Sequence, residues 1–244
     1  MITVHHLEKA QSFRVVWLLE ELKLLNDTST IDYELKLYKR TEEKRMAPPE
    51  YKALSPLGTA PTITTSDGFV MNESNAILEF IVDLATEAGG SGGTAAAALR
   101  PRVSSPSRES FLFWFHAVQG SMQPMLTVDI VFRRAVLKVP CIIRSIVAMV
   151  GSKVRDALIM PRLNNMLEMA ERQLSKEKYL AGNNLTIADI SAIYPFSSLF
   201  TRYPEYSDAY PACQAWLDRM FLRPAFQTAQ KKVGEEGGIV FENE

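Results

Sequence analysis

The chain has 244 residues, of which 47% are hydrophobic and 23% charged, and its formal net charge is -1. This composition predicts a folded protein of one large or two small domains, excludes a disordered chain and gives no sign of a nucleic-acid partner. The two cysteines and three histidines are too few and too scattered for a disulfide framework, a zinc ribbon or a histidine-rich site, so no metal is expected.

The first part of the chain alternates between strand and helix patterns. Apolar residues alternate with polar ones in the strands, whereas they recur every three or four residues in the helices. A strand, a helix and a strand in succession predict a right-handed parallel crossover, and two short strands around an Asp-Gly turn then predict a hairpin. The expected strands are 2–7, 31–37, 61–65 and 69–71, and the expected helices are about 15–25 and 73–85.

The rest of the chain, after a glycine-rich stretch from Ala88 to Thr94, has helical periodicity almost throughout. Thr186 and Asp189 have the spacing of a capping box at the start of one helix, which we interpret as structural. The expected helices are about 107–137, 161–175, 186–200, 208–221 and 224–232.

The glycine-rich stretch marks a boundary between two domains of different class. A four-stranded sheet with helices, in the order βαβ and then ββα, is typical of the thioredoxin type. The long helices that follow predict an all-α second domain. We therefore expect a thioredoxin-like α/β domain at 1–87, a linker at 88–104, an all-helical domain at 105–233 and a tail at 234–244.

Nothing in the pattern predicts an exported or membrane-bound protein. The N-terminal residues reach charge too soon for a signal peptide. The most apolar stretch, 139–150, contains Pro140 and Arg144 and is too short to span a bilayer. We therefore expect a cytoplasmic protein with no membrane partner.

Five short motifs accompany this domain division, namely Leu7–Leu22, Ala47-Pro-Pro-Glu50, Leu54–Pro61, Asn72-Glu-Ser74 and Leu185-Thr-Ile-Ala-Asp189. In these motifs and their order the chain resembles the cytosolic glutathione S-transferases, most of all the branch found in fungi and many bacteria. The resemblance covers nearly the whole chain and implies the glutathione transferase fold, with glutathione as the cofactor. It also implies a homodimer, in which the first domain of one copy packs on the long helices of the other.

The resemblance implies where glutathione binds. Ala60-Pro61 stands where the family has a cis-proline turn, so the Ala60 backbone, next to Thr59, is expected to pair with the cysteinyl backbone of glutathione. The alternative is a trans-proline that opens an edge strand. Glu73 and Ser74 precede a helix, whose N–H groups and hydroxyl suit a carboxylate, while the Glu73 carboxylate suits an ammonium group. Read alone, this pair is a helix cap.

At the positions expected to bind the glycyl end of glutathione, the chain departs from the family pattern. Relatives tend to carry His and Lys where this chain has Ser55 and Thr59. Losing those cations weakens the hold on a carboxylate. Lys44 and Arg45, in the loop ahead of Ala47, are the residues that we expect to compensate. We therefore expect detectable glutathione binding.

A second departure concerns the group that activates the glutathione thiol. Related sequences have a Ser, Tyr or Cys at the position of Ala10, which can donate no hydrogen bond to a thiolate. Ser12 is the catalytic candidate: it either donates to the thiolate or caps the first helix by accepting from the N–H of Val15. Backbone N–H groups over 11–13 are a further source of stabilisation.

The pocket for the second substrate is expected between this turn and the first long helix of the second domain. His116, Gln119 and Gln123 follow the spacing i, i+3, i+7 and so share one helical face. They are either ordinary polar positions or the lining of that pocket. In the second case, His116 is able to donate or accept a proton near neutral pH.

Three functions fit these residues. The first is a transferase whose glutathione thiolate attacks a hydrophobic electrophile. The second is a glutathione-dependent cis–trans isomerase, which adds the thiol reversibly to an alkene in a biosynthetic, secondary-metabolite pathway. The third is a non-catalytic protein that binds glutathione or another ligand, a function that Ala10 favours. Conjugation consumes glutathione stoichiometrically, whereas isomerisation does not.

Overall fold

The computed structural model describes residues 1–25, 31–43, 46–88, 95–234 and 237–238. Its first domain holds a four-stranded sheet of order β2-β1-β3-β4, in which β1 runs parallel to β2 and antiparallel to β3. The register pairs Val4 at the centre of β1 with Leu35 and Ile63. The sheet therefore has the expected thioredoxin-like order. The strands are β1 (Ile2–Leu7), β2 (Tyr33–Tyr38), β3 (Thr62–Thr65) and β4 (Val70–Asn72).

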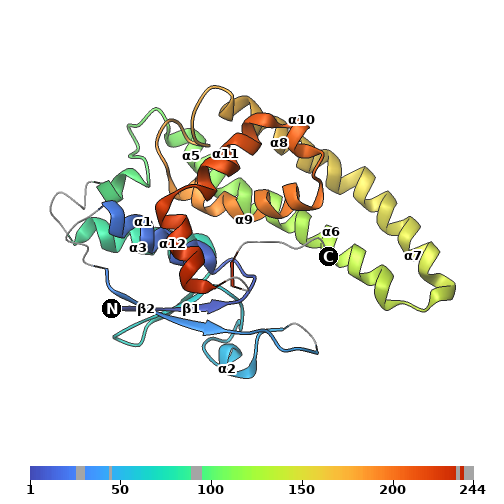
Figure 1. Ribbon diagram of the computed structural model, residues 1–244, viewed down its shortest axis with the longest axis horizontal. Helices are drawn as coiled ribbons and strands as arrows, with labels where there is room; N and C mark the ends of the chain where they lie inside the picture. Colours follow the sequence, from blue (N-terminus) through green and yellow to red (C-terminus); the bar gives the residue numbers. More distant parts are fainter. Residues whose placement is uncertain (26–30, 44–45, 89–94, 235–236, 239–244) are drawn as a thin grey trace.

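Helices cover both faces of this sheet (Figure 1). α1 (Phe13–Leu25) and α3 (Ser74–Glu87) lie on one side, and the short α2 (Pro49–Lys52) lies on the other. Every residue of α1 from Phe13 to Leu22 is buried, including the two glutamates that an amphipathic helix would expose. One reason is a C-terminal helix, α12 (Pro224–Val233), which packs against α1.

The second domain is all-helical, as expected. The predicted helix at 107–137 is present, but a π-helical turn (η1, Val118–Met122) divides it into two α-helices. A second π turn (η2, Arg155–Ile159) joins α7 to α8. α7 was not predicted from the sequence, because its apolar run was considered only as a membrane span. The helices are α5 (Arg108–Ala117), α6 (Gln123–Lys138), α7 (Cys141–Val154), α8 (Met160–Leu174), α9 (Ile187–Arg202), α10 (Tyr206–Ala209) and α11 (Pro211–Phe221).

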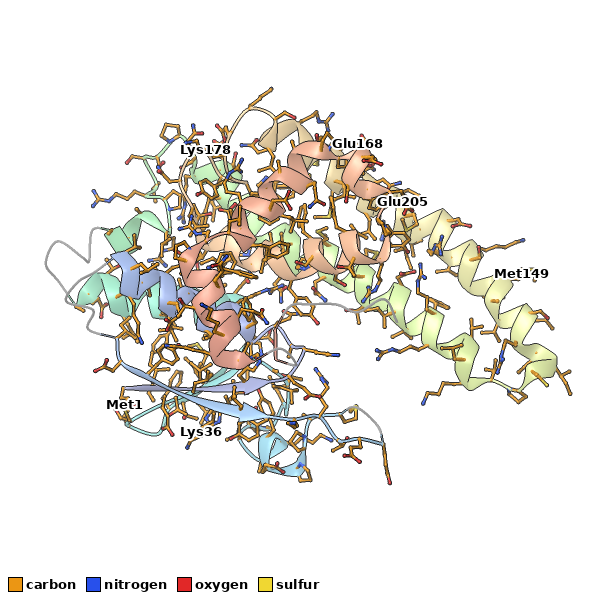
Figure 2. The ribbon with its side chains drawn as sticks, viewed as in Figure 1. Met1, Lys36, Met149, Glu168, Lys178 and Glu205 are labelled. Atoms are coloured by element: carbon orange, nitrogen blue, oxygen red, sulfur yellow. The ribbon has the colours of Figure 1, made fainter. Side chains whose placement is uncertain are left out.

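The ends of α6 and α7 run side by side and form an arm that extends from the rest of the molecule (Figure 1). Several large apolar side chains on this arm are exposed, among them Ile142 (85%), Ile146 (56%) and Met149 (54%). Figure 2 labels Met149 near the far end of the arm. No helix within the described ranges is both long and apolar enough to cross a membrane.

The second half of the predicted linker belongs to the helical core. Residues 95–98 are helical, and the side chains of Ala96 and Leu99 are buried. The carbonyl of Leu99 accepts the N–H of Ile187 at 2.9 Å, which ties this segment to the start of α9. At that start, the Asp189 carboxylate accepts the N–H of Thr186 at 3.0 Å, so the capping box is present. The glycine-rich residues 89–94 lie outside the described residues.

Candidate active site

A cavity of about 370 Å³ lies between the two domains. One wall comes from the turn after β1 and from the loops on either side of α2. The other wall comes from α6 and α9. This position brings the backbone of the first domain to face polar side chains of the second. The lining residues are Leu7, Lys9, Ala10, Gln11, Arg40, Met46, Ala47, Lys52, Gly58, Thr59 and Ala60 on the first wall, and Gln123, Thr127, Ile130, Tyr194, Ser198 and Arg202 on the second.

Gln11 joins three elements at the edge of this cavity. Its side-chain oxygen accepts the Oγ–H of Ser74 at the start of α3 (2.9 Å) and Nε2–H of Gln119 in η1 (3.0 Å). It also accepts from NH1 of Arg14, on α1, at 3.0 Å. Three donors on one amide oxygen fix the turn after β1 with respect to both domains.

Arg14 is a buried cation directly behind that turn. Its side chain is fully buried, and its guanidinium carbon lies 5.6 Å from the centre of the Tyr194 ring. NH1 also donates to Gln119 at 3.1 Å, but Nε and NH2 have no hydrogen-bond partner among the described residues. Burial lowers the pKa of Arg14 to about 9, against an opposing influence of Tyr194. The group remains charged at neutral pH, so it holds an uncompensated positive charge close to Gln11.

The position of Ser12 does not favour the catalytic role that the sequence suggests. Its side chain is fully buried and does not line the cavity. Nε2 of His6 donates to the carbonyl of Gly237 at 2.9 Å, so Nδ1 of the neutral ring is an acceptor. The Ser12 hydroxyl, 3.0 Å from Nδ1, donates its single proton there. No proton remains for a thiolate.

Ser12 does not cap α1 through its side chain either. The N–H of Val15 donates to the backbone carbonyl of Ser12 at 3.1 Å, and the Oγ instead accepts the N–H of Leu7 at 3.2 Å. The backbone N–H groups of residues 11–13 were expected to stabilise the thiolate. That of Phe13 instead donates to the carbonyl of Ala10 at 3.3 Å. The N–H of Gln11 takes part in none of the hydrogen bonds found within the described residues.

The residues expected to bind glutathione surround the cavity or lie next to it. Thr59 and Ala60 line it, and the bond between Ala60 and the buried Pro61 is cis, as the sequence predicts. Glu73 is exposed just before α3, and Ser74 is buried against Gln11. Lys44 and Arg45, expected to hold the glycyl carboxylate, lie outside the described residues.

Of the three residues expected to line the second-substrate pocket, two lie at the cavity or next to it and one lies away from it. Gln123 lines the cavity, and Gln119 reaches it through Gln11. His116 is exposed, packs against the ring of Phe115 and does not line the cavity. The π turn at Val118–Met122 explains this, because its extra residue per turn breaks the spacing on which the expected shared face depends. The expected role of His116 therefore has no support in the lining of this cavity.

Sequence reasoning missed the wall that α9 contributes. Tyr194, Ser198 and Arg202 follow one another at intervals of four, so they share a helical face, and all three line the cavity. The hydroxyl of Tyr194 also donates to the carbonyl of Lys9 at 3.2 Å, which fastens α9 to the turn after β1. The i, i+4, i+8 spacing was the available signal, but the same helix has buried residues all around.

A thioredoxin-like domain joined to a helical domain, with a cavity between them at the turn after β1, defines a protein of the glutathione transferase class. Residues 10–84 match the family model of the glutathione S-transferase N-terminal domain, and residues 140–224 match that of the C-terminal domain. Glutathione S-transferase 3 of Schizosaccharomyces pombe is 30% identical over 244 residues, which cover 99% of this chain and 91% of that protein. The chain therefore belongs to the glutathione S-transferase family.

Other relatives agree with this assignment. Glutathione S-transferase 1 of Saccharomyces cerevisiae is 25% identical over 239 residues, covering 95% of each chain. A glutathione S-transferase structure from Actinobacillus pleuropneumoniae superposes with a TM-score of 0.71 at 25% identity, over 98% of this chain and 94% of that one. A glutathione transferase from Phanerochaete chrysosporium with oxidized glutathione shares the fold, with a TM-score of 0.68 at 21% identity, over 95% and 94% of the two chains. The family and fold expected from the sequence are confirmed.

Proposed function

We propose that this protein is a glutathione transferase that binds glutathione in the cavity between its domains and activates the thiol for attack on an electrophile. The observation that carries the proposal is the position of Ala60, which lines the cavity on the same wall as the turn after β1. There it pairs with the cysteinyl backbone of glutathione as an added strand would. The γ-glutamyl end then points to Glu73 and Ser74 at the start of α3.

The thiolate is stabilised without a side-chain hydroxyl at position 10. The N–H of Gln11 donates to the sulfur, and the N-terminal end of α1 adds its positive partial charge. Behind them, Arg14 supplies a full positive charge that no carboxylate of the described residues neutralises. A charge in a buried, low-dielectric position acts on a neighbouring anion more strongly than it would in water.

The thiol proton leaves to water, and the thiolate sulfur then forms a bond to the electrophilic carbon. In a substitution, a leaving group departs with its electron pair. In an addition to an activated alkene, the π electron pair moves to the neighbouring carbon, and the carbanion that results takes a proton from water. For the glycyl carboxylate of glutathione, Lys44 and Arg45 remain the proposed partners. Two cations of the cavity lining, Arg40 and Lys52, support them from the loops around α2.

Titration calorimetry at millimolar glutathione tests the binding, and we expect a saturable signal that S-methylglutathione competes away. No binding at that concentration contradicts the proposal. Measuring glutathione before and after reaction with an activated alkene then separates two activities. Stoichiometric loss supports conjugation, whereas turnover without loss supports the isomerase.

We also propose that the protein acts in the cytoplasm as a homodimer. The exposed apolar side chains on α7, including Ile142 and Ile146, form a face that a second copy covers. Sedimentation tests this, with an expected mass of twice 27.4 kDa. Replacing Ile146 by Glu is expected to shift the protein toward the monomer, whereas Ser145→Glu is the matched control on the same helix. A wild-type mass of one chain contradicts the dimer.

A further inference from the structure

The wall of the cavity that faces the first domain is polar rather than hydrophobic. α9 contributes two hydroxyls and a guanidinium, from Tyr194, Ser198 and Arg202. α6 adds Gln123 and Thr127, and only Ile130 is aliphatic. A site for an apolar electrophile is ordinarily lined by aliphatic and aromatic side chains with few polar groups. This wall therefore suits a substrate that carries a polar or charged group of its own.

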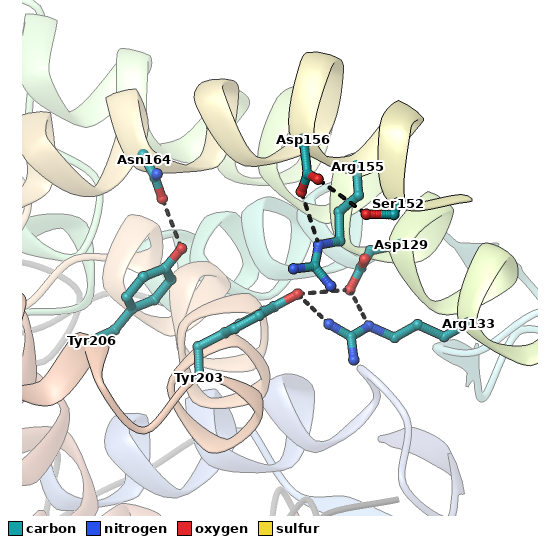
Figure 3. Close-up of polar contacts among 8 residues, drawn as sticks. All are labelled: Asp129, Arg133, Ser152, Arg155, Asp156, Asn164, Tyr203 and Tyr206. Atoms are coloured by element: carbon teal, nitrogen blue, oxygen red, sulfur yellow. Dashed lines mark hydrogen bonds and ion pairs between the residues drawn. The ribbon is translucent and has the colours of Figure 1, made fainter. Parts of the chain in front are cut away.

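Arg202 is the charged member of that wall, and its charge is not matched by a bonded acid. Its NH1 is buried, and the described part of the chain offers it no hydrogen-bond partner. Asp129 is the carboxylate that acts on it electrostatically. However, the Asp129 carboxylate already accepts Nε–H of Arg133 at 2.9 Å and the hydroxyl of Tyr203 at 3.2 Å (Figure 3). The guanidinium of Arg202 therefore forms no hydrogen bond with a carboxylate of the described residues.

The charges of the residues that line the cavity also favour a substrate with a negatively charged group. Among the described residues, the cavity lining includes Lys9, Arg40, Lys52 and Arg202 but neither an aspartate nor a glutamate. The glycyl carboxylate of glutathione accounts for Arg40 and Lys52 on the wall from the first domain. Arg202 lies on the opposite wall, eight residues along α9 from Tyr194, a rise of about 12 Å.

We propose that the electrophile carries a carboxylate, which Arg202 binds as a charge-assisted hydrogen-bonded pair at the α9 end of the cavity. This inference rests on the proposed transferase function and specifies its second substrate. The carboxylate is held at one end of the substrate while the electrophilic carbon lies at the other, next to the glutathione sulfur. In an aryl halide of this kind, the sulfur–carbon bond forms, halide leaves with its electron pair, and the thiol proton goes to water.

The test compares two aryl chlorides that differ only in charge, 4-chloro-3-nitrobenzoate and its methyl ester. For each, kcat/KM is divided by the rate constant of the uncatalysed reaction with glutathione, which removes the difference in intrinsic reactivity. We expect a preference of roughly tenfold or more for the carboxylate, the value of one charge-assisted hydrogen bond. No preference, or a preference for the ester, overturns the inference.

Two variants locate the effect. Arg202→Gln is expected to raise KM for the carboxylate roughly tenfold while leaving the ester and glutathione affinity within about twofold. Arg134→Gln, which removes the same charge from an α6 residue outside the cavity lining, is the control and is expected to keep the preference. Equal losses for both aryl chlorides in Arg202→Gln contradict the assignment.

A binding measurement separates this inference from the proposed function. Calorimetry with 3-nitrobenzoate and its methyl ester, with and without S-methylglutathione, requires no turnover. Binding of the carboxylate that is lost in Arg202→Gln supports the anion site, even if neither aryl chloride reacts and the transferase function fails. Glutathione binding and turnover of the ester without binding of nitrobenzoate would retain the transferase and refute the anion site.

Discussion

The guanidinium of Arg14 donates through NH1 to the side-chain oxygen of Gln11 over 3.0 Å, and Gln11 lines the cavity between the domains. A fully buried cation is thereby held one residue away from the bare Ala10. Under the proposed function, this buried charge takes the part that a hydroxyl side chain has in related sequences. The pair also forms a direct connection between the core of α1 and the proposed sulfur position.

Replacing Arg14 by Met is expected to raise the pKa of the thiol of bound glutathione by about one unit, which corresponds to about 1.4 kcal/mol. The reason is that the buried charge favours the thiolate. The ultraviolet absorbance of the thiolate, followed against pH in the binary complex, measures it. Arg14→Lys keeps a charge and is expected to recover part of the shift. An unchanged thiol pKa in a folded Arg14→Met protein would show that the charge is irrelevant.

Ser12→Ala is expected to act on stability and not on the thiol. It removes the acceptor of the Leu7 N–H and the donor to His6, at a cost of about 1–3 kcal/mol in the free energy of unfolding. Urea unfolding measures that loss. The pKa of the bound glutathione thiol is expected to remain that of the wild type. A clear rise in that pKa would restore Ser12 as the catalytic donor.

His6 gives the fold a dependence on pH. Burial lowers its pKa to about 4, against an opposing hydrogen bond to Gly237. The unfolded chain, with a pKa near 6.5, binds the proton more readily, so stability falls as the pH drops from about 6.5 toward 4. The loss from this group is about 2 kcal/mol at pH 5. Urea unfolding at pH 7 and 5 measures it, and His6→Asn is expected to remove that share of the difference. An equal pH effect in the variant would exclude His6 as its source.

Arg223, just before α12, forms two hydrogen bonds with the nearly buried Glu21 of α1, at 2.5 and 2.8 Å. Arg223→Met leaves that carboxylate with only the indole N–H of Trp17 as a partner among the described side chains. We expect a loss of about 2 kcal/mol in unfolding free energy, below the value for a fully buried pair because Arg223 is partly exposed. Lys231→Met, an exposed position on α12, is the control. Equal unfolding midpoints for the two variants would contradict this.

The sequence predicted the elements that local patterns determine. The succession of strand, helix and strand predicted the parallel pairing of β1 and β2, and the capping box of Thr186 and Asp189 predicted the start of α9. The sequence did not predict which faces of these helices and strands pack against each other. The π turn in η1 and the contact between α9 and Lys9 depend on packing between segments far apart in the chain. The hydrogen bond from the Ser12 hydroxyl to His6 could not be predicted either, because it forms only once β1 and α1 are folded together.

The packing of α12 on α1 has a consequence for how the molecule comes apart. The ring of Phe226 lies 5.0 Å from that of Phe13 and 5.2 Å from that of Trp17, so the last helix completes the hydrophobic core of the first domain. A fragment ending at the compositional boundary near residue 87 would expose those two aromatic faces to water. We therefore expect the thioredoxin-like domain and the helical domain to unfold together as one cooperative unit.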